Sequence, residues 1–217
     1  MELSNFYAGR TSAPLYQSEG QFTPVSLEVV ELGELPIPSR EVGASDPFVI
    51  MDGFPRFAVP ADRGRLQLSV ADVSTAQDGS HRREAYLSLL FSDARPAAVL
   101  PAIPIGEGEE LAEGNFYGVP VDAGTVSFFD AASMADFLKA NSGEELEELT
   151  EEWIDLLWDE SEHRSGLALT HYETNSGEHL IPLVQSGWGD GFYPVLKTVD
   201  AQGNVLGLHI DLEVVGE

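Results

Sequence analysis

The sequence predicts one α+β domain, built mainly from antiparallel β-sheet in a sandwich-like arrangement, with two helices inserted in the middle of the chain. Runs of alternating apolar and polar residues occupy both ends of the chain, whereas residues 130–162 repeat apolar side chains every three or four positions. Strands that lie before and after one helical segment favour α+β over an alternating α/β fold. Because 217 residues suit one core, we expect residues 1–217 to form a single domain.

The first half of the chain contains two clear strand patterns, at residues 65–72 and 84–91. In the first of these, apolar residues fall on alternate positions, at Leu66, Leu68 and Val70. That period of two is typical of a strand with one buried face. Asp78 and Gly79, among other polar residues, separate the two runs, so we expect an antiparallel hairpin with a longer loop.

Four further strand-like runs follow the helical segment, at residues 165–173, 178–185, 191–199 and 204–215. The last has the most regular alternation, with apolar residues at Leu206, Leu208, Ile210, Leu212 and Val214. Asp200 to Gly203 supply a turn before it, which predicts a C-terminal hairpin. His209 falls on the polar side of this strand, and we therefore expect it to be exposed.

Two helices fit the middle of the chain. Asp130 precedes AASMADFLKAN and can act as an N-cap, because its carboxylate can accept hydrogen bonds from the free N–H groups of the first turn. In the second helix, Ser142 and Glu145 have the spacing of a capping box. Its expected buried stripe consists of Leu146, Leu149, Trp153, Leu156 and Leu157. The opposite face is almost entirely glutamate and aspartate, which is usual for a solvated face and would also attract a basic partner.

The composition is strongly acidic, with 11 Lys and Arg against 37 Asp and Glu and a formal net charge of −26. Such a field repels phosphate, so we expect no direct nucleic-acid binding and no binding to anionic membranes. A basic protein partner would be attracted instead, although the same charge also serves solubility. The chain has no cysteine, which excludes disulfides and a thiol nucleophile.

The N-terminal sequence MELSNFYAGRTSAPLY lacks the basic start and continuous apolar stretch of a signal peptide. No run approaches the roughly 18 apolar residues of a membrane span. We therefore expect a cytoplasmic location.

The segment SGWGDGFYPV, Ser186 to Val195, places Asp190 between two glycines. It can be a working carboxylate, or part of a turn in which Asp190 bonds a nearby backbone N–H and the glycines adopt positive φ. The chain contains no Walker pattern, GxGxxG, HExxH or GxSxG motif that would indicate an established chemistry. The aromatic residues beside Asp190 can line a ligand pocket or fill the core.

Three segments together resemble a known family: Asp46-Pro47, then VDAG at Val121 to Gly124 with FFD shortly after, then SGWGDGFYPV. They are similar to the bacterial domain of unknown function family 4241, whose named motif is GDG. The resemblance covers residues 35–217 and leaves residues 1–34 as an N-terminal strand region. It implies no reaction, cofactor or catalytic residue, and the acidic helix is a departure that is particular to this sequence.

Two functions follow from different residues. The first is a soluble, strongly acidic binding protein without catalysis, which acts through its acidic face or through a small-ligand site at Trp188, Gly189, Asp190, Gly191 and Phe192. The alternative is a carboxylate-based hydrolase that uses Asp122 and Asp190, with help from Tyr193 or His209. Converging carboxylates at Asp122, Asp130 and Asp190 would also suit Mg2+ or Ca2+.

Overall fold

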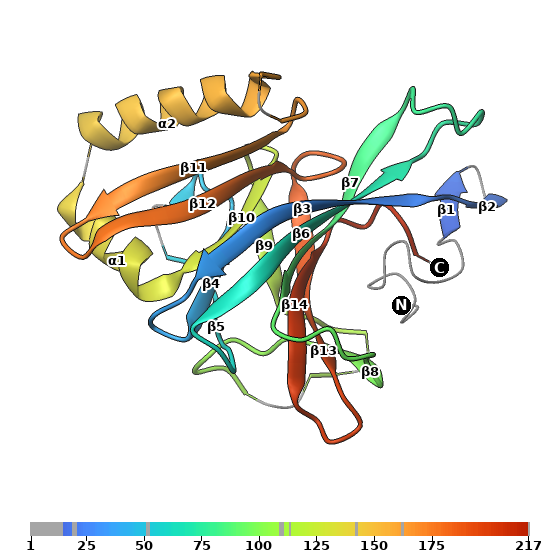
Figure 1. Ribbon diagram of the computed structural model, residues 1–217, viewed down its shortest axis with the longest axis horizontal. Coiled ribbons are helices and arrows are strands. Elements are labelled where there is room, and N and C mark those ends of the chain that lie inside the picture. Colours follow the sequence, from blue (N-terminus) through green and yellow to red (C-terminus); the bar gives the residue numbers. More distant parts are fainter. Residues whose placement is uncertain are drawn as a thin grey trace.

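The computed structural model describes residues 15–18, 21–50, 53–108, 111–112, 114–141, 143–161 and 163–216. Two antiparallel sheets and two helices make up most of this part, which confirms the predicted α+β class (Figure 1). The helices lie in the middle of the chain, with strands before and after them.

The larger sheet has the strand order β3-β6-β7-β14-β13-β8, and β9 pairs with the N-terminal part of β13. Its strands are β3 (Leu27–Pro36), β6 (Arg63–Asp72), β7 (Arg82–Leu90), β8 (Ala98–Pro101), β9 (Gly118–Val121), β13 (Gly191–Val199) and β14 (Val205–Asp211). All pairs are antiparallel. Both predicted hairpins, β6–β7 and β13–β14, are confirmed.

The smaller sheet has the strand order β11-β12-β10-β4-β5. Its strands are β4 (Glu41–Ser45), β5 (Arg56–Ala58), β10 (Thr125–Asp130), β11 (Leu167–Thr174) and β12 (Gly177–Gln185). A separate hairpin consists of β1 (Leu15–Ser18) and β2 (Gln21–Pro24).

Alternation along the strands of the smaller sheet divides the buried side chains between two cores. On β10, Val126 and Phe128 face a core shared with the larger sheet, whereas Phe129 faces the helices. On β11, Leu167 faces the first core and Tyr172 the second. The smaller sheet is therefore the middle layer, with the larger sheet on one face and the helices on the other.

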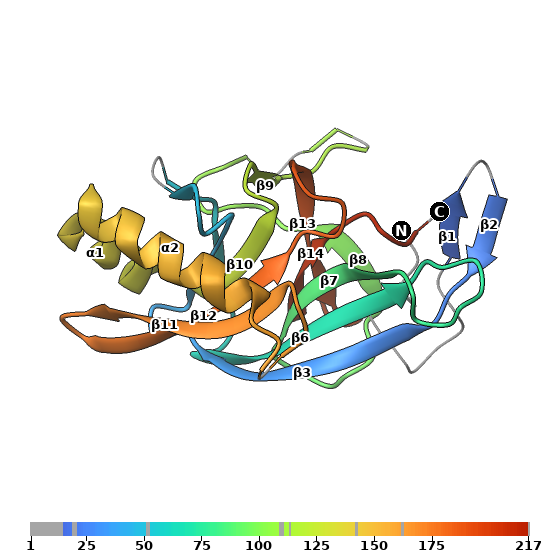
Figure 2. The same ribbon diagram turned by 90° about the horizontal axis from the view of Figure 1, so that it is seen from above.

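Helix α1 (Ala131–Ala140) begins after Asp130, whose carboxylate accepts a hydrogen bond from the Ser133 N–H at 2.9 Å, so the predicted N-cap is confirmed. Helix α2 (Glu144–Trp158) follows Gly143, which makes no side-chain cap. Ser142, the predicted capping residue, lies outside the described residues. Figure 2 shows both helices at one end of the molecule, beside β11 and β12.

Two expectations about burial are wrong. His209 is fully buried, because β14 lies between β7 and β13 and both of its faces are covered. Leu156 is 42% exposed, whereas Trp153 and Leu157 are buried in the second core. The four-residue step from 153 to 157 sets the inner face of α2, and residue 156 is rotated about 100° from 157 toward the solvent.

Candidate functional site

The three segments that carry the family resemblance meet where the chain passes between the two sheets. The turn at 122–124 connects β9, which pairs with the larger sheet, to β10 in the smaller one. The turn at 186–190 connects β12 in the smaller sheet to β13 in the larger one. The two crossings lie side by side, because the Ser186 N–H donates to the Gly124 carbonyl oxygen at 2.9 Å.

Asp46 holds the 122–124 turn in place through hydrogen bonds to its backbone. Its side chain is fully buried, and Oδ2 accepts hydrogen bonds from the backbone N–H groups of Asp122 (3.1 Å) and Ala123 (2.7 Å). Oδ1 accepts from the Phe48 N–H at 3.0 Å. Burial raises the pKa of Asp46, although these N–H donors oppose the rise. The aspartate of the Asp46-Pro47 pair is thus a structural acceptor for a turn that lies 76 residues later in the chain.

Two hydroxyl groups hold the GDG turn through the Gly189 carbonyl oxygen. Ser186 Oγ donates to that oxygen at 2.6 Å and Tyr193 Oη donates at 2.8 Å. Burial of Tyr193 raises the pKa of its hydroxyl, and the nearby Glu213 and Asp190 carboxylates raise it further. The hydroxyl proton of Tyr193 is therefore used in the hydrogen bond to the Gly189 carbonyl oxygen, and Tyr193 stabilises the GDG turn.

Each glycine of the SGWGDG segment is required for a different structural reason. Gly187 has φ +61°, and a Cβ there would lie 2.8 Å from the Glu84 carbonyl oxygen, so only glycine fits against β7. Gly189 has φ +97°, which glycine adopts without strain. Gly191 has no positive φ, contrary to the turn hypothesis, and instead leaves room for the ring of Tyr193, whose Cζ would lie 3.3 Å from a Cβ.

Asp122 and Asp190 are both exposed at this corner. Neither carboxylate makes a hydrogen bond or an ion pair to any residue that the structure describes, so the side-chain bond expected for Asp190 in a turn is not made. The turn depends on the Gly189 carbonyl instead. Both carboxylates lie in open solvent without a hydrogen-bond partner among the described residues to orient them, which does not suit a catalytic acid and base.

Asp130 belongs to another part of the molecule. It lies at the far end of the six-residue strand β10, about 20 Å from the 122–124 turn at about 3.3 Å per residue. Its carboxylate accepts from the hydroxyls of Ser39 (2.6 Å) and Ser133 (2.8 Å). Burial alone would raise the pKa of Asp130, but these hydrogen bonds outweigh it and the pKa is lowered. Across the described residues, no three His, Asp or Glu side chains form a group that could hold a metal ion.

His209 is part of a buried polar row on the larger sheet. Its Nδ1 lies 2.9 Å from Ser88 Oγ, and its Nε2 lies 3.1 Å from Thr198 Oγ1. Complete burial lowers the pKa of His209 to about 3, so the imidazole stays neutral. Both ring nitrogens have hydroxyl partners and no solvent reaches them, which does not suit an acid or base for a substrate.

The aromatic residues beside the motif divide between core and surface. Tyr193 is buried, whereas Trp188 is 44% exposed and Phe192 is 52% exposed. The Arg83 guanidinium lies 5.0 Å from the centroid of the Trp188 ring. The ring of Phe116 stacks on Phe192, with centroids 5.7 Å apart. Of the residues predicted to bind a ligand, these two aromatics are therefore the ones that present large apolar surfaces.

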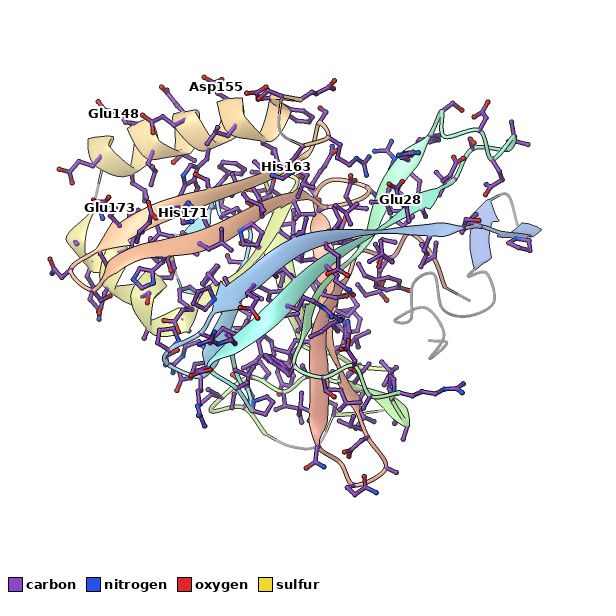
Figure 3. All side chains as sticks on the ribbon, viewed as in Figure 1. Glu28, Glu148, Asp155, His163, His171 and Glu173 are labelled. Carbon is purple, nitrogen blue, oxygen red and sulfur yellow. The ribbon has the colours of Figure 1, made fainter. Side chains whose placement is uncertain are left out.

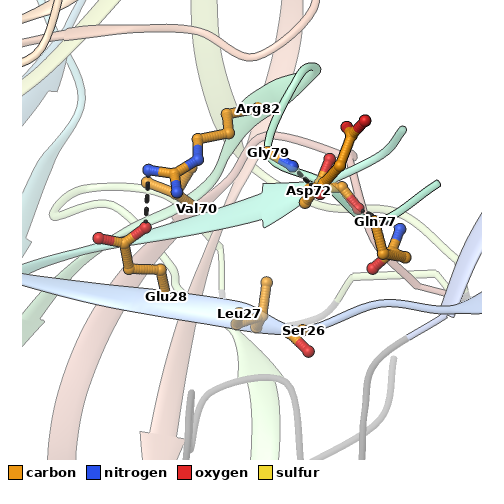
Figure 4. Close-up of a pocket in the computed structure, with 9 residues that line it drawn as sticks. Ser26, Leu27, Glu28, Val70, Asp72, Gln77, Gly79 and Arg82 are labelled. Atoms are coloured by element: carbon orange, nitrogen blue, oxygen red, sulfur yellow. Dashed lines mark hydrogen bonds and ion pairs between the residues drawn. The ribbon is translucent and has the colours of Figure 1, made fainter. Parts of the chain in front are cut away.

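A cavity of about 410 Å3 lies away from the motif, between β3 and the β6–β7 hairpin (Figure 4). Its charged side chains have partners nearby. Arg82 pairs with Glu28 at 3.0 Å, and Asp72 accepts from the Gly79 N–H at 2.6 Å. This hollow is therefore a feature of the hairpin and contains none of the predicted site residues.

A buried ion pair that the sequence does not reveal lies beside the GDG turn. Glu84 on β7 is 1% exposed, and its Oε1 lies 3.0 Å from Nη1 of Arg164 in the loop after α2. Burial raises the pKa of Glu84, and Arg164 opposes the rise. The pair ties the helical layer to the larger sheet. The alternation along β7 places Glu84 on a polar face and gives no signal that a distant arginine meets it there.

The outer face of α2 is the second candidate surface. Its exposed acidic residues are Glu145, Glu147, Glu148, Glu151, Glu152 and Asp155. Figure 3 shows Glu148 and Asp155 pointing away from the sheet that α2 covers. Throughout the described residues, none of these carboxylates has a cation within ion-pair distance, whereas glutamates on other elements, such as Glu28, do have one.

Comparison with known proteins identifies one family. The family described as "Protein of unknown function (DUF4241)" matches residues 35–210. No curated protein and no solved structure matches the chain significantly. None of the described helices has the length and apolar character needed to cross a bilayer. Because the match spans most of the sequence and contains all three segments that meet at the sheet crossing, the chain belongs to the DUF4241 family of proteins of unknown function.

Proposed function

We propose that the protein is a binding protein without catalysis of its own, which recruits a basic protein partner through the acidic outer face of α2. The observation that supports this proposal is the row of exposed carboxylates on α2 that have no cation among the described residues. Like charges three and four positions apart on a helix repel one another by a few tenths of a kcal/mol per pair. A cationic partner would remove that repulsion, and the net charge of −26 would speed its approach.

The hydrolase alternative has no comparable support. Asp122 and Asp190 are exposed and unassisted, the Tyr193 hydroxyl is bonded to a carbonyl, and His209 is buried between two hydroxyls. The proposal includes a cytoplasmic location, which fractionation of cells that produce the protein would test.

The binding test compares two variants of equal net charge. The first replaces four acids on α2 by glutamine: Glu147, Glu148, Glu151 and Glu152. The second replaces four exposed acids elsewhere by their amides: Asp122, Glu173, Glu178 and Asp190. Glutamine and glutamate have similar helix propensities, so α2 should remain folded in the first variant.

The probe is a synthetic 18-residue peptide of alternating Lys and Ser, and its affinity is measured by calorimetry at about 0.15 M salt, where the screening length is about 8 Å. We expect the α2 variant to bind the peptide at least tenfold more weakly than wild type and the control variant to bind within about twofold. Equal losses in both variants would mean that the peptide responds only to total charge. An unchanged affinity in the α2 variant would place binding elsewhere.

A further inference from the structure

The C-terminal half of α2 exposes large apolar side chains. Ile154 is 43% exposed and Trp158 is 53% exposed. Residues four apart on a helix are neighbours on one side, so these two side chains form a continuous apolar surface. Leu156 is also exposed, at 42%, but lies about 160° around the helix from Ile154, on the opposite shoulder. Ile154 and Trp158 do not pack in the core between α2 and the smaller sheet, because Trp153 and Leu157 occupy the inner face of the helix.

The apolar pair continues a row of acidic residues along the helix. Glu147, Glu151, Ile154 and Trp158 follow one another at steps of four, three and four, and therefore lie along one side. At 1.5 Å per residue the row is about 17 Å long, which is three turns of a partner helix. Its first half is anionic and its second half is apolar.

The C-terminal end of α2 also carries negative charge that no basic residue of the helix offsets. The C-terminus of a helix carries a partial negative charge, which basic residues in the last turn normally offset. Helix α1 has Lys139 in that position, whereas α2 has no basic residue in its last turn. Asp155 and the C-cap residue Asp159 add negative charge there instead. A cation supplied by a partner would interact with both carboxylates and with the helix end.

We propose that the row Glu147–Glu151–Ile154–Trp158 is the docking surface for a basic amphipathic helix of a partner protein. Lysine or arginine side chains of that helix would face the glutamates and the C-terminal end of α2, and its apolar side chains would cover Ile154 and Trp158. This inference rests on the proposed function and adds the kind of segment that is recognised. A second copy of this chain does not fit, because its own row offers no cation to the glutamates, whether the two helices run parallel or antiparallel.

The test uses single substitutions on the two shoulders of α2. Ile154→Ala and Trp158→Ala remove the apolar surface of the row, and Leu156→Ala is the matched control, because Leu156 and Ile154 are almost equally exposed. The probe is an 18-residue amphipathic peptide of Leu and Lys, compared with a Ser and Lys peptide of the same charge. Affinities are measured by calorimetry, and circular dichroism of the free variants checks that α2 remains helical.

We expect the Leu/Lys peptide to bind wild type at least tenfold more tightly than the Ser/Lys peptide. Ile154→Ala and Trp158→Ala should each remove most of that advantage, whereas Leu156→Ala should change the affinity by less than about twofold. Binding should also shift the fluorescence of Trp158 to shorter wavelength, because the exposed indole becomes buried. The Trp158→Ala variant should lose this shift.

The outcomes separate the two proposals. If both peptides bind equally and the α2 glutamine variant binds neither, the acidic face recruits cations and the helix-docking inference is wrong. If the three alanine variants lose affinity equally, the contact is not confined to the row and the inference is also wrong. If neither peptide binds wild type, both proposals are wrong.

Discussion

Asp211 makes the stability of this protein depend on pH in a way that one substitution should abolish. The residue lies on the central strand β14 and is 3% exposed, and within the described part of the chain its carboxylate accepts one hydrogen bond, from the Glu213 N–H at 2.9 Å. Burial raises its pKa to about 7, with a smaller contribution from the Glu213 carboxylate, whereas the Glu213 N–H opposes the rise. In the unfolded chain an aspartate has a pKa of about 3.9. The folded state therefore favours the protonated acid.

The sign follows from linkage. A raised folded pKa gives stability that is fully present below the unfolded pKa and is lost as the pH rises through the folded pKa. The full shift of about 3 pH units corresponds to about 4 kcal/mol, at 1.36 kcal/mol per unit. Near its pI of about 4.2 the protein has little net charge and tends to precipitate, so the unfolding measurements begin at about pH 5. Between about pH 5 and about pH 8, Asp211 should lower the free energy of unfolding by about 3 kcal/mol.

Asp211→Asn keeps the shape and the acceptor for Glu213 but does not ionise. Urea unfolding of wild type and variant at both pH values should show the variant gaining about 3 kcal/mol relative to wild type on going from pH 5 to pH 8. Asp190→Asn, on the surface, controls for the loss of one negative charge, and self-repulsion of the remaining charges is common to all three proteins. Parallel pH profiles for wild type and Asp211→Asn would refute the reasoning.

Two further predictions concern buried hydrogen bonds. Asp46→Ala should lower the free energy of unfolding by about 3 kcal/mol in urea titrations, because three N–H groups lose their acceptor. Asp122→Asn and Asp190→Asn, at the same corner, should change the free energy of unfolding by less than about 0.5 kcal/mol. Equal losses in all three variants would mean that the Asp46 carboxylate does not stabilise the 122–124 turn. Tyr86→Phe should cost about 1 kcal/mol because it removes a buried hydrogen bond. Tyr172→Phe should not destabilise, because the buried Tyr172 hydroxyl has no hydrogen-bond partner among the described residues, and a loss as large as that of Tyr86→Phe would contradict this.

The sequence by itself determined the local structure, because the interactions involved span only a few residues. Alternation identified β6, β7 and β14, and turn residues identified the two hairpins. Asp130 could be recognised as an N-cap because its donor, Ser133, lies only three positions ahead. The acidic outer face of α2 was also predictable, because its glutamates alternate with the apolar stripe at helical spacing.

Only the tertiary structure decided how these elements meet, because the decisive contacts join residues far apart in the chain. No local pattern shows that Asp46 accepts hydrogen bonds from the 122–124 turn, or that Glu84 meets Arg164. A period of two distinguishes the two faces of a strand but does not show whether the polar face is covered. The central position of β14 therefore buries His209, against the expectation that it is exposed, and buries Asp211 as well. Burial in turn sets the pKa values of both residues.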